Sequence, residues 1–202
     1  SRTPLKRIIV GKIEDYLPPL KKILFPIIGK KGVDVPAIEE SEELFLFQHL
    51  LRKITAPLVA PDTKPADIAL LQYTGGTTGT SKGAMLSHRN IVVNNAQMRH
   101  WYFVAREGQE TFISVLPFFH SYGMAAALNL PLSLGAALIL IPRYVPKDVL
   151  KAVEHSKATF LPGIPAIYAS LNACEDIKKY DVSSVAYCIS GSAPLRDTVL
   201  ND

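Results

Sequence analysis

The residues best suited to chemistry lie in one short segment, residues 74–82, which reads TGGTTGTSK. It holds three glycines, four threonines, one serine and one lysine, so no large apolar side chain is available to join a core. Glycine lets backbone amides approach a ligand closely, hydroxyls add short donors, and a lysine charge suits phosphate. This composition predicts a loop that holds an anion, with a polyphosphate as the favoured ligand.

Two elements must position this loop. The apolar run at residues 68–73 predicts a buried strand that stops where the glycines begin, and residues 83–86 form a second apolar run. Ser87 then predicts the N-cap of a helix over residues 88–101. A flexible polar linker rarely lies between two such runs. The order of residues also excludes a Walker A loop and a GxGxxG dinucleotide fingerprint.

Two further segments follow predicted strands. Residues 117–123, PFFHSYG, come after a strand predicted at 111–116, and residues 190–195, SGSAPL, come after one at 185–190. Loops at the carboxyl ends of parallel strands share one edge of a sheet, so we expect the three segments to meet in one crevice. Taken alone, His120 is more typical of a packed or capping histidine, and SGSAPL is typical of an ordinary turn.

The periodicity predicts an α/β fold, a mostly parallel sheet flanked by helices. Strands are expected at residues 5–10, 68–73, 111–116, 136–141, 158–161 and 185–190. Helices are expected at residues 13–28, broken at Pro18, Pro19 and Pro26, and at 42–51, 88–101, 122–134, 146–156 and 164–173.

Composition bounds the class of protein. Hydrophobic residues make up 48% of the chain, an ordinary globular fraction, and the net charge of +4 comes from scattered basic residues. This favours a solvated surface over a nucleic-acid interface. Cys174 and Cys188 are predicted to be buried thiols in a reducing, cytoplasmic setting. The apolar stretch at residues 128–141 is too short and broken to span a membrane, which predicts a soluble protein and leaves open a weak membrane-surface association. The oligomeric state is not determined.

Other residues give weaker indications of a functional site. Trp101, Tyr102 and Phe103 are predicted to join the core rather than stack on a cofactor. His49, His100 and His155 show no metal-ligand spacing with Cys, Asp or Glu, and GxSxG is absent. For His88 and Arg89, a functional role is evenly balanced against an ordinary helix start in which Ser87 is the cap and Arg89 and Asn90 face solvent.

The order of residues at 74–83, TGGTTGTSKG, resembles the phosphate-binding signature of adenylate-forming enzymes. This superfamily includes acyl-CoA synthetases, luciferases and the adenylation domains of peptide synthetases. The segments LPFFHSYGM and SGSAPL resemble its next two signatures, with Ser192 standing where a glycine is usual.

The resemblance implies roles for individual residues. The phosphates of ATP would be bound by Thr74, Gly75, Gly76, Thr77, Thr78, Gly79, Thr80 and Lys82, and Thr77 would also contact Mg²⁺. The adenine and acyl pocket would involve Gly191, Ser192, Ala193 and Pro194. His120, Thr77 and Lys82 would be the catalytic residues, with His120 touching the substrate carboxylate or the acyl-adenylate oxygen rather than acting as a general base.

The implied reaction is ATP-dependent activation of a fatty acid to an acyl-adenylate, followed by transfer to coenzyme A. The family's YGxTE and TGD motifs and its small C-terminal domain are not found in residues 1–202. We therefore expect a partial AMP-binding domain without its C-terminal lid, inactive by itself, from a long-chain acyl-CoA synthetase. Two alternatives stay open: a related ligase acting on an aryl or amino acid, and a non-catalytic nucleotide-binding module.

Overall fold

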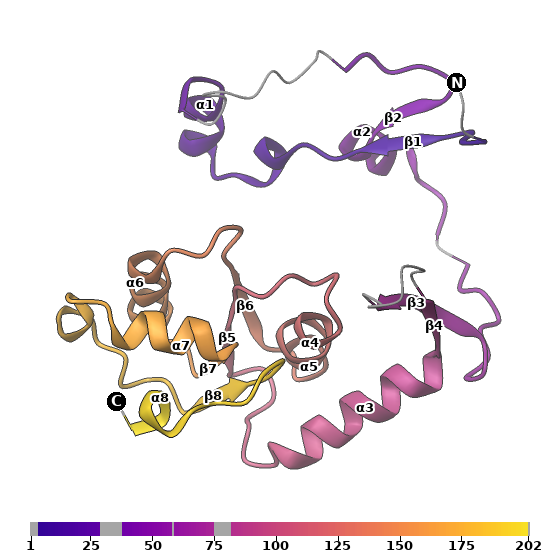
Figure 1. The fold of residues 1–202 in the computed structure, drawn as a ribbon. Coiled ribbons are helices and arrows are strands. Elements are labelled where there is room, and N and C mark those ends of the chain that lie inside the picture. Colours follow the sequence, from indigo (N-terminus) through magenta and orange to yellow (C-terminus); the bar gives the residue numbers. More distant parts are fainter. Residues whose placement is uncertain (1–3, 29–37, 58, 75–81, 202) are drawn as a thin grey trace. The chain divides into compact units, whose positions relative to one another are not determined.

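The computed structural model describes residues 4–28, 38–57, 59–74 and 82–201 (Figure 1). The chain divides into two compact units, residues 1–62 and residues 63–202.

The first unit is built on a short parallel strand pair. Strand β1, Ile8–Val10, pairs with β2, Leu44–Leu46. A 3-10 helix η1, Ile13–Tyr16, and helix α1, Pro19–Ile28, follow β1, and helix α2, Phe47–Lys53, follows β2. The strand predicted at the start of the chain is confirmed over its last three residues. Among the residues of this unit whose side chains the structure describes, none is buried.

The helix predicted at residues 42–51 is wrong in its first half, which forms β2. The backbone N–H of Leu44 donates to Ser41 Oγ at 3.1 Å, and that of Leu46 donates to Glu40 Oε1 at 3.0 Å. These side-chain acceptors, together with pairing to β1, hold the segment extended, although its apolar spacing suits a helix. The helix α2 begins only at Phe47.

Prolines act differently at the two ends of α1. The break predicted at Pro18 and Pro19 is confirmed, because η1 and α1 are separate elements and α1 begins at Pro19. The break predicted at Pro26 is wrong, because α1 continues through this position to Ile28. Only two helical residues follow Pro26, so its missing N–H affects no more than the last turn.

The second unit contains a four-stranded parallel sheet. Its strands are β5, Thr111–Ser114, β6, Ala137–Leu140, β7, Phe160–Gly163, and β8, Tyr187–Ser190. They lie in the order β6-β5-β7-β8, and all three neighbouring pairs are parallel. The predicted α/β fold with a parallel sheet flanked by helices is confirmed.

Helices connect these strands (Figure 1). Between β5 and β6 run α4, Ser121–Met124, the π-helix η2, Ala125–Asn129, and α5, Leu130–Ser133. Helix α6, Pro146–Ser156, precedes β7, while α7, Pro165–Asn172, and the 3-10 helix η3, Ile177–Lys179, precede β8. Helix α8, Asp197–Asn201, follows β8. The helical path continues through Pro131, as predicted, because the proline lies at the start of α5 directly after the wider π turn.

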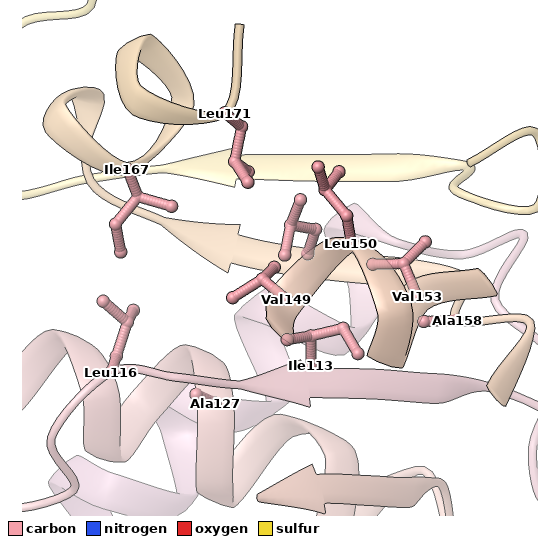
Figure 2. Packing of buried hydrophobic residues seen from close by; sticks show 10 residues of the cluster. Ile113, Leu116, Ala127, Val149, Leu150, Val153, Ala158, Ile167 and Leu171 are labelled. Carbon is pink, nitrogen blue, oxygen red and sulfur yellow. The ribbon is translucent and has the colours of Figure 1, made fainter. Parts of the chain in front are cut away.

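The core lies between the sheet and its helices. Helix α6 contributes Val149, Leu150 and Val153, whose exposed fractions are 0%, 3% and 1%. Figure 2 shows these side chains gathered near Ile113 of β5 and Leu171 of α7. Burying each aliphatic side chain contributes about 1.5–3 kcal/mol, so this cluster is a main source of stability for the unit.

An aromatic stack forms a second cluster. Phe112 and Phe160 stack with ring centroids 4.2 Å apart, and Phe160 and Tyr187 stack at 4.3 Å. The ring of Tyr102 meets Phe160 edge-on at 5.6 Å. Of the three aromatic residues predicted to join the core, only Tyr102 does so. Trp101 and Phe103 are 78% and 81% exposed, so that prediction is wrong for them.

A separate two-stranded sheet precedes the parallel one. Strand β3, Ile68–Thr74, pairs antiparallel with β4, Lys82–Ser87. The strand predicted here exists, but the prediction that it is buried is wrong, since Ile68 is 58% exposed and Leu71 50% exposed. A two-stranded sheet offers each strand only one partner, so it covers less apolar surface than a central strand of a larger sheet would.

Helix α3, His88–Trp101, begins as predicted. Ser87 Oγ accepts a hydrogen bond from the backbone N–H of Asn90 at 3.2 Å, and Asn90 Oδ1 accepts one from the N–H of Ser87 at 3.0 Å. This reciprocal pair satisfies donors that a helix start otherwise leaves free. Further along, Arg99 Nη1 donates to the carbonyl of Ser133 at 2.9 Å, which ties α3 to the end of α5.

Candidate functional site

The predicted phosphate loop is described only at its two ends. Its central positions, which hold Gly75, Gly76, Thr77, Thr78, Gly79 and Thr80, lie outside the described residues. Thr74 ends β3, Lys82 begins β4, and the two are Cα partners in the antiparallel ladder. The ladder therefore holds the two ends of the segment side by side, with Lys82 exposed. The roles of these residues stay predictions.

His120 lies at the start of α4. Its Nδ1 accepts a hydrogen bond from the backbone N–H of Tyr122 at 3.2 Å, so the imidazole caps the helix and is otherwise exposed. A neutral histidine that accepts at Nδ1 carries its proton on Nε2. That N–H is a donor rather than a base, which suits contact with a carboxylate or acyl oxygen. A catalytic role for His120 stays a prediction.

One side chain connects β3 to the segment that holds His120. Gln72 Nε2 donates to the backbone carbonyl of Phe119 at 3.4 Å, across 47 residues of chain. The hairpin that carries the ends of the glycine- and threonine-rich segment therefore contacts the residue directly before His120.

Tyr122 connects the second and third segments. Its hydroxyl lies 2.5 Å from the carbonyl oxygen of Ile189 and 3.1 Å from that of Gly163, at the ends of β8 and β7. The face of its ring lies against Gly191, where an added Cβ would come within 2.7 Å of the ring. Burial raises the pKa of Tyr122 to about 12, and the neighbouring Tyr102 hydroxyl adds to the shift.

The third segment turns away from the sheet directly after β8. Gly191 is half-buried, while Ser192, Ala193 and Pro194 are exposed. Ser192 has φ 69°, in the left-handed region that favours glycine. This conformation explains why glycine suits the position, and serine adopts it here nonetheless. The adenine-binding role of the segment stays a prediction.

A cavity opens at the carboxyl ends of β5 and β6. Its volume is about 400 Å³. Its wall is formed by Ser114, Val115, Leu116, Pro117, Phe118, Phe119, Leu140, Ile141 and Pro142. All but Ser114 are apolar, and the Ser114 hydroxyl is already bonded to the carbonyl of Ala127 at 2.9 Å. Such a wall suits an apolar ligand.

A second hollow, of about 320 Å³, lies at the start of α3. It is lined by Thr63, Lys64, Pro65, His88, Arg89, Val92 and Val93. The backbone N–H of Arg89 donates to the carbonyl of Pro65 at 2.9 Å, and both His88 and Arg89 are exposed. The exposure of Arg89 agrees with a solvent-facing helix start, and a functional role for His88 and Arg89 stays a prediction.

Two residues that join the segments were not singled out from the sequence. Gln72 is a polar residue within a largely apolar strand, and Tyr122 is a hydroxyl-bearing ring just before the apolar run at residues 124–128. These sequence contexts were the signals from which a role for the two residues could have been suspected. Their partners could not be read from the sequence, because the carbonyls they contact are brought close only by the fold.

The remaining predictions concern cysteines, metals and membranes. Cys174 is half-buried and Cys188 exposed, both are free thiols, and the prediction of a buried Cys188 is wrong. Among the residues described, no group of three or more His, Cys, Asp or Glu could hold a metal ion. Within the same ranges, no helix is both long and apolar enough to cross a membrane.

Comparison with known proteins decides the family. The family model described as "AMP-binding enzyme" matches residues 18–202 of the chain. The chain belongs to the AMP-binding enzyme family. It is 38% identical over 194 residues to a long-chain-fatty-acid–CoA ligase of Bacillus subtilis, an alignment covering 94% of this chain and 34% of the relative. It is 30% identical over 200 residues to the 4-coumarate–CoA ligase CCL1 of Humulus lupulus, with 96% and 35% covered.

Solved structures agree on the fold of this AMP-binding chain. The N-terminal domain of FACL13 from Mycobacterium tuberculosis matches with a TM-score of 0.71 at 19% identity, covering 97% of this chain and 47% of that one. ATP-bound MatB from Rhodopseudomonas palustris matches with a TM-score of 0.70 at 25% identity, covering 96% and 36%. The chain thus spans about a third of the length of the curated relatives it matches. Its fold is that of the N-terminal part of an adenylate-forming enzyme.

Proposed function

We propose that this chain forms the nucleotide- and acyl-binding part of a long-chain fatty acid–CoA ligase. The observation that carries the proposal is the Tyr122 contact, which joins the segment of His120 to the turn at Gly191. Gln72 adds a contact from the hairpin that carries Thr74 and Lys82. Contacts that span 47 and 67 residues of the chain thus join these segments near the carboxyl ends of β5, β7 and β8, and α/β sheets bind ligands at such strand ends.

In the proposed first step, a fatty carboxylate attacks the α-phosphate of ATP and releases pyrophosphate. Lys82 and the threonine hydroxyls would neutralise and orient the phosphates. The Nε2–H of His120 would donate to the carboxylate or to the acyl-adenylate oxygen. Mg²⁺, when bound, neutralises phosphate charge, and a threonine hydroxyl such as that of Thr77 is a hard oxygen donor that fits it. In the second step the thiol of coenzyme A attacks the acyl carbon, loses its proton, and AMP leaves.

The assignment to a fatty acid is supported by the cavity of about 400 Å³ and by the named activity of the Bacillus subtilis relative. Apart from Ser114, whose hydroxyl is bonded to backbone, the wall offers no polar side chain. An aryl acid is the second candidate, because a 4-coumarate–CoA ligase matches over 96% of the chain. The proposed partners are therefore small molecules: an acyl substrate, ATP and coenzyme A.

The test is ATP–pyrophosphate exchange by the protein that carries this chain, with palmitate, 4-coumarate and phenylalanine as substrates. Palmitate-dependent exchange supports the proposal. Preference for 4-coumarate or phenylalanine would move it to the aryl or amino acid class, and absence of exchange with all three would remove the enzyme assignment.

Lys82→Ala tests the phosphate loop. We expect a ten- to hundredfold slower exchange, about the effect of losing one charge-assisted hydrogen bond. The matched control is Lys151→Ala, an exposed lysine on α6. Transfer from preformed acyl-adenylate to coenzyme A should be much less affected, because pyrophosphate has already left. If Lys82→Ala slows both half-reactions equally, Lys82 serves the structure rather than phosphate binding.

A further inference from the structure

Two tyrosine hydroxyls converge on one backbone carbonyl at the end of the sheet. Tyr122 of α4 and Tyr168 of α7 place their hydroxyls 2.5 Å and 2.8 Å from the carbonyl oxygen of Ile189. Each hydroxyl also lies near a carbonyl of β7: Gly163 at 3.1 Å from Tyr122, and Leu161 at 2.6 Å from Tyr168. The two tyrosines come from different helices and both hold the β7–β8 pair.

The rings add packing to these hydrogen bonds. An added Cβ at Gly191 would lie 2.7 Å from the Tyr122 ring, and one at Gly163 would lie 3.0 Å from the Tyr168 ring. Each ring therefore packs directly on a backbone without a side chain between them. A Cβ at either position would force the tyrosine ring to shift, so the two glycines allow these close contacts.

The number of hydroxyl protons limits the hydrogen bonds that the two tyrosines can donate to β7 and β8. Each tyrosine has one proton to donate, while three carbonyls lie within reach. The carbonyl of Gly163 also accepts from the backbone N–H of Gly191, at 3.3 Å. Each hydroxyl has one carbonyl of β7 and the Ile189 carbonyl of β8 within hydrogen-bond distance, and it shares its one proton between them. Each hydroxyl thus supplements the strand pairing just where β8 ends and the turn begins.

We propose that Tyr122 and Tyr168 form a clamp that positions the turn at residues 190–195 for the adenylation reaction. The clamp rests on the proposed function of that turn, and neither tyrosine is assigned a chemical step. The turn needs such support because Ser190, Ser192, Ala193 and Pro194 are exposed and Ser192 adopts a left-handed conformation. Because these residues lie outside the core, contacts at the base of the turn help to hold its geometry.

The test compares Tyr122→Phe and Tyr168→Phe with Tyr144→Phe as the matched control. Tyr144 is also half-buried, and its hydroxyl lies 3.2 Å from the Ile167 carbonyl oxygen and 2.8 Å from Ser170 Oγ, away from the turn. All three variants keep the ring and lose one hydroxyl, so a general loss of stability affects them alike.

Two measurements are made on the protein that carries this chain. Amide hydrogen exchange, followed on peptides that cover residues 189–196, should become about three- to tenfold faster in both clamp variants, as expected for one lost hydrogen bond. It should not change in Tyr144→Phe. In pyrophosphate exchange the KM for ATP should rise by a similar factor in the clamp variants, with a smaller change in kcat, and stay at the wild-type value in the control.

The outcomes separate the clamp from the proposed function. Amide hydrogen exchange can be measured in an inactive protein. If the clamp variants exchange faster but the wild-type protein shows no ATP–pyrophosphate exchange, the proposed function is overturned and the clamp is not. Unchanged hydrogen exchange in the clamp variants, or equal changes in all three variants, overturns the clamp. Faster hydrogen exchange with an unchanged KM overturns the positioning role.

Discussion

Ser192 is a residue whose backbone conformation matters more than its side chain. Its φ of 69° places a residue with a Cβ in a region where that atom crowds the following carbonyl, at a cost of about 1–2 kcal/mol. Strained conformations of this kind occur preferentially at ligand sites. The position directly follows Gly191, against which Tyr122 packs, so strain and close packing coincide at one turn.

Substitution of Ser192 should follow this conformation. Ser192→Gly should raise the free energy of unfolding by only about 0.5 kcal/mol, because the relief of strain is largely offset by the greater freedom of glycine in the unfolded chain. Ser192→Val should lower it by about 1–2 kcal/mol, since a β-branched residue is especially unfavourable at positive φ. Urea denaturation measures both. The control is Ala193→Val, because Ala193 is an exposed neighbour that does not have a positive φ. This substitution should change the free energy of unfolding very little.

Tyr122 should also make stability depend on alkaline pH. Burial raises its pKa from 10.0 to about 12, so between these values the unfolded chain releases the phenolic proton while the folded chain keeps it. The stabilisation is therefore complete below about pH 10 and is lost as pH rises toward 12. Urea denaturation at pH 9, 10 and 11 should show that the free energy of unfolding falls with pH, and that it falls less steeply in Tyr122→Phe than in the wild-type protein. Tyr16→Phe, at a side chain 62% exposed, is the control, and identical slopes in all three proteins would contradict the prediction.

The helical connection between β5 and β6 is tightly constrained where α4 begins, beside the end of β5. Helix α4 begins directly beside the strand end, and Gly123 is buried there. An added Cβ would lie 2.1 Å from the carbonyl oxygen of Pro117. The close approach brings α4 back against its own strand, which lets His120 cap the helix and Tyr122 reach β8. The position of two site residues thus depends on one glycine.

Gly123→Ala should accordingly be strongly destabilising. The methyl group meets backbone rather than a flexible side chain, so α4 must shift, and we expect a loss of about 3 kcal/mol, the upper part of the range for overpacking. Thermal or urea unfolding measures the loss. Gly11→Ala is the matched control, since a Cβ there meets nothing within 4 Å. A Gly123→Ala protein as stable as the control would show that α4 is not held against residues 116–117.

On the scale of the whole molecule, buried residues are concentrated in one unit. The buried residues of the two hydrophobic clusters lie between Phe112 and Leu171, all within residues 63–202. In residues 1–62, none of the side chains that the structure describes is buried. Cooperative stability follows from buried apolar area, so it should reside in the second unit.

Expression of the two units separately should reveal this difference. Residues 63–202 should retain a cooperative thermal transition followed by circular dichroism, while residues 1–62 alone should unfold without one, because they bury too little surface to offset chain entropy. The full chain is the reference for the midpoint. A cooperative transition in residues 1–62, or its absence from residues 63–202, would contradict the assignment.

Much of the second unit could be predicted from local patterns. The spacing of Val149, Leu150 and Val153 predicted α6, and all three side chains are buried. The serine before α3 predicted its cap, because the N-cap interaction involves neighbours only three residues away. Local patterns failed at residues 42–51, where pairing between β1 and β2 prevailed over helical spacing.

The sequence by itself determined the alternation of strands and helices, the helix caps, and the three segments that resemble the signatures of adenylate-forming enzymes. These depend on short-range periodicity, hydrogen bonding and residue order. Only the tertiary structure decided that β3 pairs with β4 in a separate sheet and that Gln72 and Tyr122 join those segments. An apolar run indicates that a strand needs a partner but not which partner, and a side chain finds a carbonyl 67 residues away only when the whole chain has folded.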